Sequence, residues 1–239
     1  MGKVAVYTIG CKVNQAESEE LKMDLAAHGH EVCRDPAAAD LCVVNTCTVT
    51  AESDRKCRKL VRWLSRSGDA GIVVAGCYAE VSPRELDSLP GVARVIPNRG
   101  KDGWADEISD MLGASEKSVG GWGRARVRGF IKVQDGCERG CSYCIVPRAR
   151  GPERSRPVAQ VKAQARRWLE QGTAELVLCG VNLGRYGKGT GQDLAGLVRV
   201  HTFFRWCLKH RRLALTHRLF AGKMTLEDVF DLEPAFESG

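Results

Sequence analysis

Short apolar runs alternate with amphipathic segments along residues 1–112, and this alternation restricts the fold more than any other feature of the chain. Four runs have the length and composition of buried strands: Val4–Ile9, Leu41–Asn45, Ile72–Ala75 and Val92–Ile96. The other segments repeat apolar residues at helical spacing: Gln15–His28, Ala51–Ser67, Ser82–Leu89 and Asp102–Leu112. Strands that alternate with helices predict a largely parallel sheet covered by helices, which is the α/β class.

A cysteine follows each of the first three predicted strands. Cys11, Cys47 and Cys77 each stand two residues beyond a strand end. Loops at the carboxyl ends of parallel strands gather along one edge of a sheet, where ligands bind, so we expect the three thiols to meet there. Three thiolates in that arrangement suit an iron–sulfur cluster that keeps one iron free of protein ligands. The alternative interpretation is that each cysteine packs in the core, as free cysteines often do.

The chain has eleven cysteines, a high number for a reducing compartment, where clustered thiols hold metal or do chemistry more often than they form disulfides. We expect Cys33, Cys42, Cys57 and Cys179 to pack inside strands or a helix. Residues 1–10 carry a single lysine and neither a long apolar core nor a cleavage site, so they do not resemble a signal peptide. Because the sequence also lacks a membrane span, we expect a cytoplasmic protein.

A second group of cysteines follows the predicted strand Phe130–Gln134. Cys137, Cys141 and Cys144 have the spacing C-x3-C-x2-C in a loop that contains glycine. This spacing lets one loop wrap a cubane cluster and bind three of its irons, which leaves the fourth iron for an outside molecule. A structural zinc site is the weaker interpretation, because zinc normally takes four protein ligands and no fourth Cys or His follows nearby.

Positive charge is concentrated in the second half of the chain. Residues 1–115 contain 14 Lys and Arg against 17 Asp and Glu, whereas residues 116–239 contain 22 against 12. Between Arg124 and Arg167, twelve basic residues face only three acidic ones. A field of this sign suits an anionic partner, with nucleic acid as the first candidate. The alternative is a solvated charged surface without a partner.

The second cysteine group, with Tyr143 before its last member, resembles the signature of radical S-adenosylmethionine (SAM) enzymes. In that superfamily the open iron binds SAM, and reduction of the cluster cleaves SAM to a radical that removes hydrogen from an unactivated carbon. The resemblance implies that the protein holds cluster, SAM and substrate together and excludes competing reactions.

Six motifs over about residues 3–198 resemble those of the methylthiotransferase branch, in the same order. They are Thr8–Gln15 with Glu17–Glu19, Asn45–Cys47, Gly76–Cys77, Asp135–Cys137, Pro147–Gly151 with Arg154–Arg156, and Gly180–Gly187. The stretch Gly10–Gln15 resembles most the enzymes that methylthiolate N6-threonylcarbamoyladenosine at position 37 of tRNA. The branches that act on isopentenyladenosine in tRNA or on a ribosomal protein differ there.

The resemblance implies two [4Fe-4S] clusters. One, on Cys11, Cys47 and Cys77, would deliver sulfur, and the other, on the C-x3-C-x2-C cysteines, would form the radical. A second SAM would supply the methyl group, so that C2 of the modified adenosine receives a methylthio group. The implied partners are tRNA, a reducing electron donor and a sulfur source, with no membrane.

Two further sets of residues are candidates for binding. Four arginines beside the cysteine loop suit RNA phosphates, which supply much of the affinity of a protein for RNA: Arg148, Arg150, Arg154 and Arg156. Unpartnered surface charge is the alternative for each of them. Asn182 and Tyr186 follow the predicted strand Leu176–Cys179, where barrel enzymes place ligand-contacting groups, and are candidates for cofactor binding.

The chain is short for a complete radical SAM barrel. A (β/α)8 barrel takes roughly 200 residues or more, and about 110 follow Arg128, so we expect an incomplete barrel. The expected domains are an α/β domain over 1–115, a linker over 116–125, a partial radical SAM domain over 126–198 and an atypical tail over 199–239. The tail is rich in basic and aromatic residues and shows no strand–helix alternation, which predicts an out-of-frame product; binding of single-stranded RNA is the alternative.

Two functions therefore follow from the sequence. The first is an enzyme of the methylthiotransferase type. The second is an inactive truncated fragment, or a cluster-binding module that keeps the α/β domain without a working radical site. A flavodoxin-like electron carrier is a further alternative for the first domain alone, although the sequence has no glycine loop for phosphate.

Overall fold

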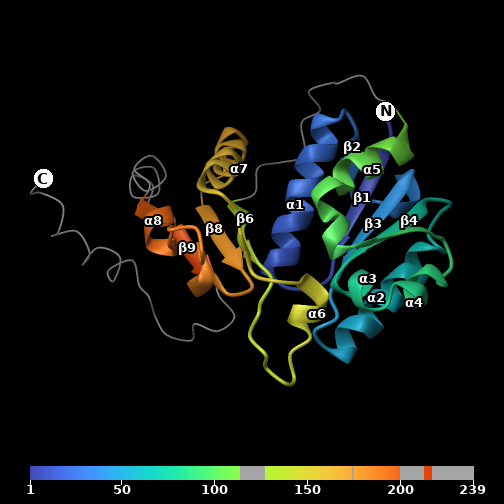
Figure 1. Cartoon of the computed structure of the whole chain (residues 1–239). Helices are drawn as coiled ribbons and strands as arrows, with labels where there is room; N and C mark the ends of the chain where they lie inside the picture. The colour runs from blue at the N-terminus through green and yellow to red at the C-terminus, as the bar shows by residue number, and fades with distance from the viewer. Residues whose placement is uncertain (114–126, 174, 200–212, 217–239) are drawn as a thin grey trace, which may run out of the picture.

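The computed structural model describes residues 1–113, 127–173, 175–199 and 213–216, which form two β-sheets and the helices that pack on them (Figure 1). The first sheet has five strands and the second has four. Figure 1 shows the two sheets toward opposite ends of the molecule, with α1 (Lys12–Ala27) and α6 (Val146–Arg150) between them. The expected fold class, an α/β domain followed by part of a radical SAM fold, is confirmed.

The first sheet is entirely parallel, with the strand order β2-β1-β3-β4-β5. Its strands are β1 (Lys3–Thr8), β2 (Glu31–Cys33), β3 (Leu41–Thr46), β4 (Gly71–Gly76) and β5 (Val92–Pro97). This is the flavodoxin-like order, in which the chain reverses direction across the sheet between β1 and β3. Ligands in such folds bind outside the carboxyl ends of the strands at that reversal, and Cys11 and Cys47 lie there.

Helices cover both faces of the first sheet because its strands alternate side chains between the two faces. Val4, Val43 and Val73 face α1 and α5 (Trp104–Leu112). The opposite face packs against α2 (Ala51–Leu64), α3 (Cys77–Val81) and α4 (Pro83–Asp87). Two short 3-10 turns, Pro36–Ala38 and Asn98–Gly103, complete this half.

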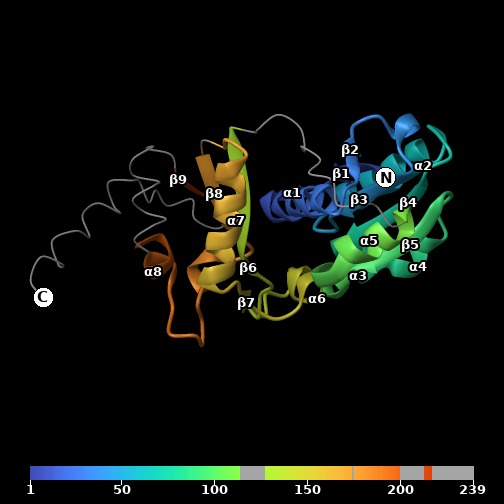
Figure 2. The ribbon, with the colours of Figure 1, turned by 90° about the horizontal axis from the view of Figure 1, so that it is seen from above.

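The second sheet has the order β7-β6-β8-β9, and only β7 runs antiparallel to its neighbour. Its strands are β6 (Arg128–Asp135), β7 (Arg154–Ser155), β8 (Glu175–Gly180) and β9 (Leu213–Thr216). The helices of this half are α7 (Val158–Glu170) and α8 (Leu194–Arg199), with a 3-10 turn at Leu183–Arg185. α7 lies along this sheet (Figure 2) and buries Trp168 completely. The Trp168 indole donates a hydrogen bond to the Phe130 carbonyl at 3.2 Å.

All six predicted strands are present, and the structure adds elements that the sequence pattern did not predict. β2 has only three residues, and α3 and α6 have five each, so none is long enough to show a periodicity. The packing interpretation is confirmed for Cys42, Cys57 and Cys179, which are buried. Cys33 lies half-buried in β2, against the core that contains Cys42 and Cys57.

The structure describes one short part of the predicted atypical tail over 199–239. β9 lies in this segment and pairs in parallel with β8, so an apolar run continues the second sheet. The rest of the predicted tail and the predicted linker over 116–125 lie outside the described residues. No helix in the described parts of the chain is long and apolar enough to cross a membrane.

Candidate functional site

The first three predicted ligands stand at the carboxyl ends of β1, β3 and β4. Cys11 is the residue before α1, Cys47 follows β3, and Cys77 begins α3. Cys47 and Cys77 are buried and Cys11 is half-buried. Gly10, at φ 141°, lets the loop after β1 come close to the loop after β3, since a Cβ at Gly10 would lie 3.0 Å from the Cys47 Cβ.

The thiols of this first triad influence one another. Burial raises the pKa of the Cys47 thiol, and the nearby Cys77 and Cys11 thiols raise it further. Within the described parts of the chain, no three Cys, His, Asp or Glu side chains converge closely enough to hold a single metal ion. In a cubane cluster each thiolate binds a different iron, so the donors stand around the cluster instead of at one point. Three thiols without a fourth ligand fit a cluster with an open iron.

Two amides contact the thiols of the first triad. The Cys11 thiol donates to Asn14 Oδ1 at 3.2 Å. Asn98 Nδ2 lies 3.4 Å from Cys77 Sγ and also donates to the Ala149 carbonyl at 2.5 Å. Asn98 is buried, and its Oδ1 has no hydrogen-bond partner among the residues that the structure describes. Each amide thus holds a candidate ligand and also takes part in contacts with the second half of the chain.

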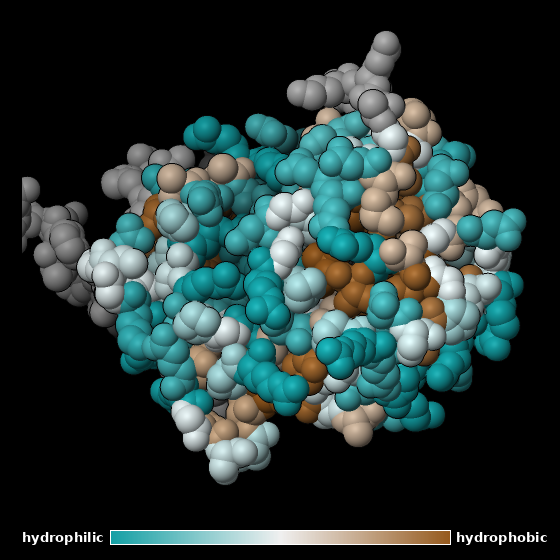
Figure 3. Space-filling view, turned by 45° about the vertical axis from the view of Figure 1, so that its right-hand side comes forward, coloured by the Kyte–Doolittle hydropathy of each residue, from teal (hydrophilic) through white to brown (hydrophobic). Residues whose placement is uncertain are grey.

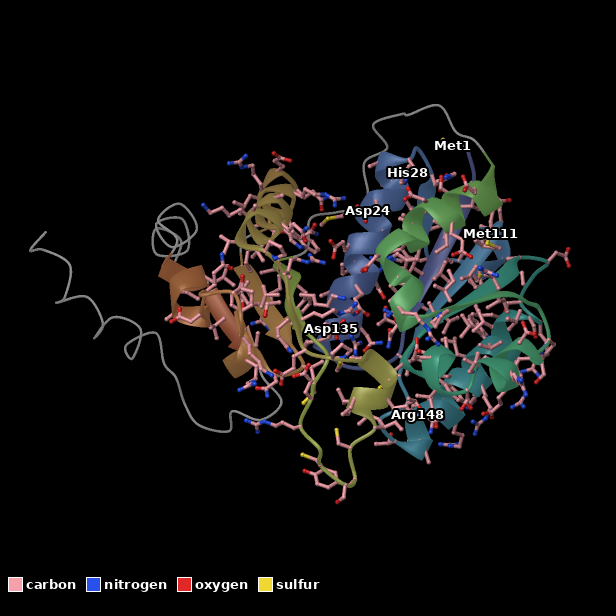
Figure 4. The ribbon with its side chains drawn as sticks, in the orientation of Figure 1. Met1, Asp24, His28, Met111, Asp135 and Arg148 are labelled. Carbon is pink, nitrogen blue, oxygen red and sulfur yellow. The ribbon has the colours of Figure 1, made fainter. Side chains whose placement is uncertain are left out.

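A buried cluster of charged side chains lies at the junction of the two halves. Glu17 of α1 is 4% exposed and accepts from three cations: Lys101 Nζ at 2.6 Å, Lys132 Nζ at 2.9 Å and Arg150 at 3.0 Å. Asp135 accepts from Arg150 at 2.9 Å and from Lys132 at 3.1 Å. Figure 4 shows Asp135 between the second sheet and α1.

The pKa values of this cluster follow from the surplus of cations. Burial opposes ionisation of Glu17, but Arg150, Lys101 and Lys132 together hold its pKa well below the usual range. The pKa of Lys101 is lowered, because burial and the nearby Arg150 outweigh the support from a carboxylate that three cations share. Arg150 is buried too, yet Glu17 and Asp135 raise its pKa. The cluster therefore keeps its carboxylates ionised at neutral pH.

The second cysteine triad lies on the loop between β6 and α6. Cys137 and Cys144 are half-buried and Cys141 is exposed. The Cys137 N–H donates to the Gly151 carbonyl at 3.1 Å, and the Cys144 N–H donates to the Cys141 carbonyl at 3.0 Å. Three donors on one loop, with no fourth, fit a cluster with an open iron as the first triad does.

The two candidates for cofactor binding differ in what their polar atoms do. The Tyr186 hydroxyl donates to the Arg156 carbonyl at 2.8 Å, and the ring packs in the core of the second sheet. Asn182 is buried and its backbone N–H donates to Gln134 Oε1 at 2.7 Å. Its side-chain Nδ2 has no partner among the described residues. Asn182 therefore has a free donor for a ligand, whereas the hydroxyl of Tyr186 is already used.

The four candidate arginines do not form one surface. Arg148 and Arg154 are exposed on the second half. Arg156 is half-buried and pairs with Glu20 of α1 at 2.9 Å. Arg150 is buried, and Glu17, Asp135 and Asn14 occupy its guanidinium, so it offers no surface to an RNA phosphate. Hydrophilic side chains cover much of the face in Figure 3. Figure 4 shows Arg148 on the α6 side of the molecule.

Sequence reasoning placed Glu17 and Asp135 inside motifs but gave them no role, and it missed Lys101, Lys132 and Asn98 altogether. One signal was present in α1. Glu17 stands between Val13 and Leu21 at a spacing of four residues, on the stripe that should be apolar. A carboxylate at such a position is buried and needs cationic partners.

Comparison with known proteins agrees with the two-part architecture. The model of the uncharacterized protein family UPF0004 matches residues 3–97, and that of the radical SAM superfamily matches residues 131–190. A solved structure of a radical SAM methyltransferase from Kitasatospora setae, with cobalamin and a [4Fe-4S] cluster bound, is similar over 90% of this chain and 56% of that chain, with a TM-score of 0.58 and 17% identity. The chain thus has an α/β domain followed by part of a radical SAM-like fold.

Comparison with curated relatives shows more closely which kind of radical SAM protein the chain is similar to. The threonylcarbamoyladenosine tRNA methylthiotransferase of Thermotoga maritima is 38% identical over 84% of this chain, and that of Bacillus subtilis is 36% identical over 79%. A ribosomal protein uS12 methylthiotransferase of Anaeromyxobacter is 32% identical over 83%. The chain belongs to the methylthiotransferase family of radical SAM enzymes. It spans about half the length of these relatives: 49%, 45% and 45%.

Proposed function

We propose that this polypeptide carries both cluster-binding parts of a methylthiotransferase that modifies C2 of N6-threonylcarbamoyladenosine at position 37 of tRNA. The observation that carries the proposal is the pair of cysteine triads, one in each half, beside one shared junction. Methylthiotransferases of this family use SAM and [4Fe-4S] clusters. The choice of substrate is supported by four relatives named for threonylcarbamoyladenosine that are 36–38% identical; a fifth relative of that name is 30% identical, and relatives named for the other two substrates are 30–32% identical.

Each triad has its own role in the proposal. Cys11, Cys47 and Cys77 hold the cluster that delivers sulfur. The C-x3-C-x2-C loop holds the cluster that binds and cleaves SAM, and the free amide donor of Asn182 contacts SAM. Arg148 and Arg154 contact tRNA phosphates, which position the RNA without reading its sequence. The proposal includes a reducing electron donor, a sulfur source and a cytoplasmic location.

Anaerobic reconstitution with iron and sulfide tests the two sites. Three chains are compared: the intact chain, one with Cys11, Cys47 and Cys77 changed to Ala, and one with Cys137, Cys141 and Cys144 changed to Ala. Each triple variant is expected to keep about half of the iron and sulfide of the intact chain, because each site holds one cluster. An intact chain that binds no iron after reconstitution would contradict the proposal.

The substrate is tested with the reconstituted chain, SAM, a strong reductant and tRNA that carries N6-threonylcarbamoyladenosine at position 37. Mass spectrometry of the digested tRNA is expected to show a methylthio group on N6-threonylcarbamoyladenosine. The same reaction is run with tRNA that carries isopentenyladenosine and with the ribosomal protein. If only one of these two molecules gave a product, that molecule would replace N6-threonylcarbamoyladenosine tRNA as the proposed substrate. Two clusters without any product would favour a cluster-binding module.

A further inference from the structure

One residue joins the two cysteine triads through a short chain of hydrogen bonds. Arg150 donates through one nitrogen to Asn14 Oδ1 at 3.0 Å, and the Cys11 thiol donates to the same oxygen. Through its other terminal nitrogen it donates to Asp135 Oδ1 at 2.9 Å. This Asp135 oxygen also accepts the N–H of Gly136, the residue before Cys137, at 2.9 Å. In the chain without a cluster, the path from the first triad to the second thus passes through a single guanidinium. A Cys11 thiolate bound to iron has no S–H, so in the cluster-bound state Arg150 acts on the first triad by fixing Asn14 and by its charge.

The end of α6, which carries Arg150, is connected to both triads by a second set of hydrogen bonds. The Ala149 carbonyl accepts from Asn98, whose Nδ2 also lies against Cys77 Sγ. The Gly151 carbonyl, at the other side of Arg150, accepts from the Cys137 N–H. Three successive residues at the end of α6 therefore fix Cys11, Cys77 and Cys137 through one intermediate group or none. Both views place α6 between the second sheet and the helices of the first half (Figures 1 and 2).

The charge of the junction suits an anion beside the first triad. Three cations with little exposed surface, Lys101, Lys132 and Arg150, meet two carboxylates, Glu17 and Asp135, which leaves one positive charge in excess; the exposed Arg154 lies 3.9 Å from Asp135 and adds to it. This excess is buried, and an uncompensated buried charge is costly. A cubane cluster bound by three thiolates is a net anion, so it would balance the excess.

We infer that Arg150 is a positioning residue that sets how the two cysteine triads face each other and stabilises the cluster-bound state of the first triad. This inference rests on the proposed two-cluster function and adds to it a residue from the second half that supports the cluster of the first. A buried arginine whose planar guanidinium donates to three partners at once can do this, whereas lysine offers a single point charge.

The test uses the full chain with both triads and the variants Arg150→Lys and Arg150→Gln. Arg167→Gln is the matched control, because Arg167 also forms an ion pair across the junction, to Asp24 at 2.7 Å, but touches neither triad. Asp24 is labelled in Figure 4, at the end of α1 away from Asp135. Two readouts are taken: iron removed from the first triad by a chelator, in chains whose second triad is replaced by alanine, and the electron paramagnetic resonance spectrum of the reduced chain with both clusters.

For both Arg150 variants we expect iron affinity at the first triad to fall about 10- to 100-fold, the usual effect of removing a group that supports a metal ligand. The magnetic interaction between the two reduced clusters should also change, since it depends on their separation. Arg167→Gln should leave both readouts as in the unmodified chain. Circular dichroism checks folding, and Arg150→Lys keeps the test informative if Arg150→Gln unfolds.

Two results would overturn the inference. One is an Arg150→Lys chain that is folded and matches the unmodified chain in both readouts. The other is an equal change in Arg167→Gln, because that would mean that any loosening of the junction has the same effect. An unmodified chain that binds a cluster at only one triad would overturn the proposed function itself, and this outcome is visible before any Arg150 variant is made.

Discussion

Glu17 lies on α1 where its neighbours four residues away, Val13 and Leu21, are apolar. Its carboxylate is therefore carried into the protein interior, where only ionised and hydrogen-bonded partners make its burial tolerable. The three cations that surround it come from three places in the sequence, so the charge cluster can form only after the two halves have met. At this scale the junction is held by charge as well as by packing.

Replacing Glu17 by Gln should therefore cost about 3–5 kcal/mol of unfolding free energy at neutral pH, because it leaves buried cations short of a partner. The pKa of Glu17 lies well below its ordinary 4.5 in the folded chain. The ionised Glu17 therefore contributes fully to the free energy of unfolding above about pH 4.5, and this contribution is lost as the pH falls through the pKa of Glu17 in the folded chain. Urea unfolding of both chains at several pH values measures this.

The difference in the free energy of unfolding between the Glu17→Gln chain and the unmodified chain should become steadily smaller below about pH 4.5. Glu20→Gln is the control, since Glu20 is partly exposed and pairs with Arg156, which is not one of the cations around Glu17. Its cost should be about 1 kcal/mol or less. Equal costs for the two substitutions would show that the burial of Glu17 has no energetic consequence.

Among the elements, β6 and α7 pack so closely at Gly129 that any side chain at this position would clash with α7. A Cβ at Gly129 would lie 2.5 Å from Cδ2 of Trp168, which is completely buried. The ring therefore sits directly on the backbone of the strand. This close contact anchors α7 over the second sheet, and β6 continues from there into the cysteine loop.

Gly129→Ala should lower the free energy of unfolding by about 1–3 kcal/mol, because the added methyl overpacks the contact with Trp168. Trp168→Leu should relieve this, so the cost of Gly129→Ala should be smaller in that background. Gly103→Ala, where nothing lies within 4 Å of the added atom, is the control and should be nearly neutral. Equal costs of Gly129→Ala in both backgrounds would contradict the packing explanation.

The sequence best predicted those elements that are long enough to show a pattern of apolar residues. Four of the five parallel strands of the first sheet follow from their apolar runs, and the rule that the carboxyl ends of parallel strands share an edge predicted where Cys11, Cys47 and Cys77 lie. The buried charge cluster could not be predicted in the same way. A charged residue in an amphipathic helix is normally exposed, and Glu17 is covered by residues far from it in the sequence: Lys101 of the first half, and Lys132 and Arg150 of the second.

On the scale of the whole molecule, charge is divided unevenly, and the basic second half is the part expected to contact tRNA. Changing exposed Arg148 and Arg154 to Gln should weaken tRNA binding and reduce the slope of log affinity against log salt by about 0.7–0.9 for each phosphate that the chain no longer neutralises. Fluorescence anisotropy at several salt concentrations measures the slope. Arg62 and Arg66, exposed on the first half, are the control pair; a larger effect from these would assign RNA binding to the other half.

α1 belongs to two cores at once. Its Leu21 and Leu25 pack in the core of the first sheet, while Val13, Ala16 and Met23 pack against residues of the second (Figure 2). One inserted residue would rotate everything beyond it by about 100° around the helix axis and turn both sets away from their partners. The length and rotational phase of α1 are thus fixed by two partners at once, so an insertion or deletion in this helix should disturb the packing of both halves.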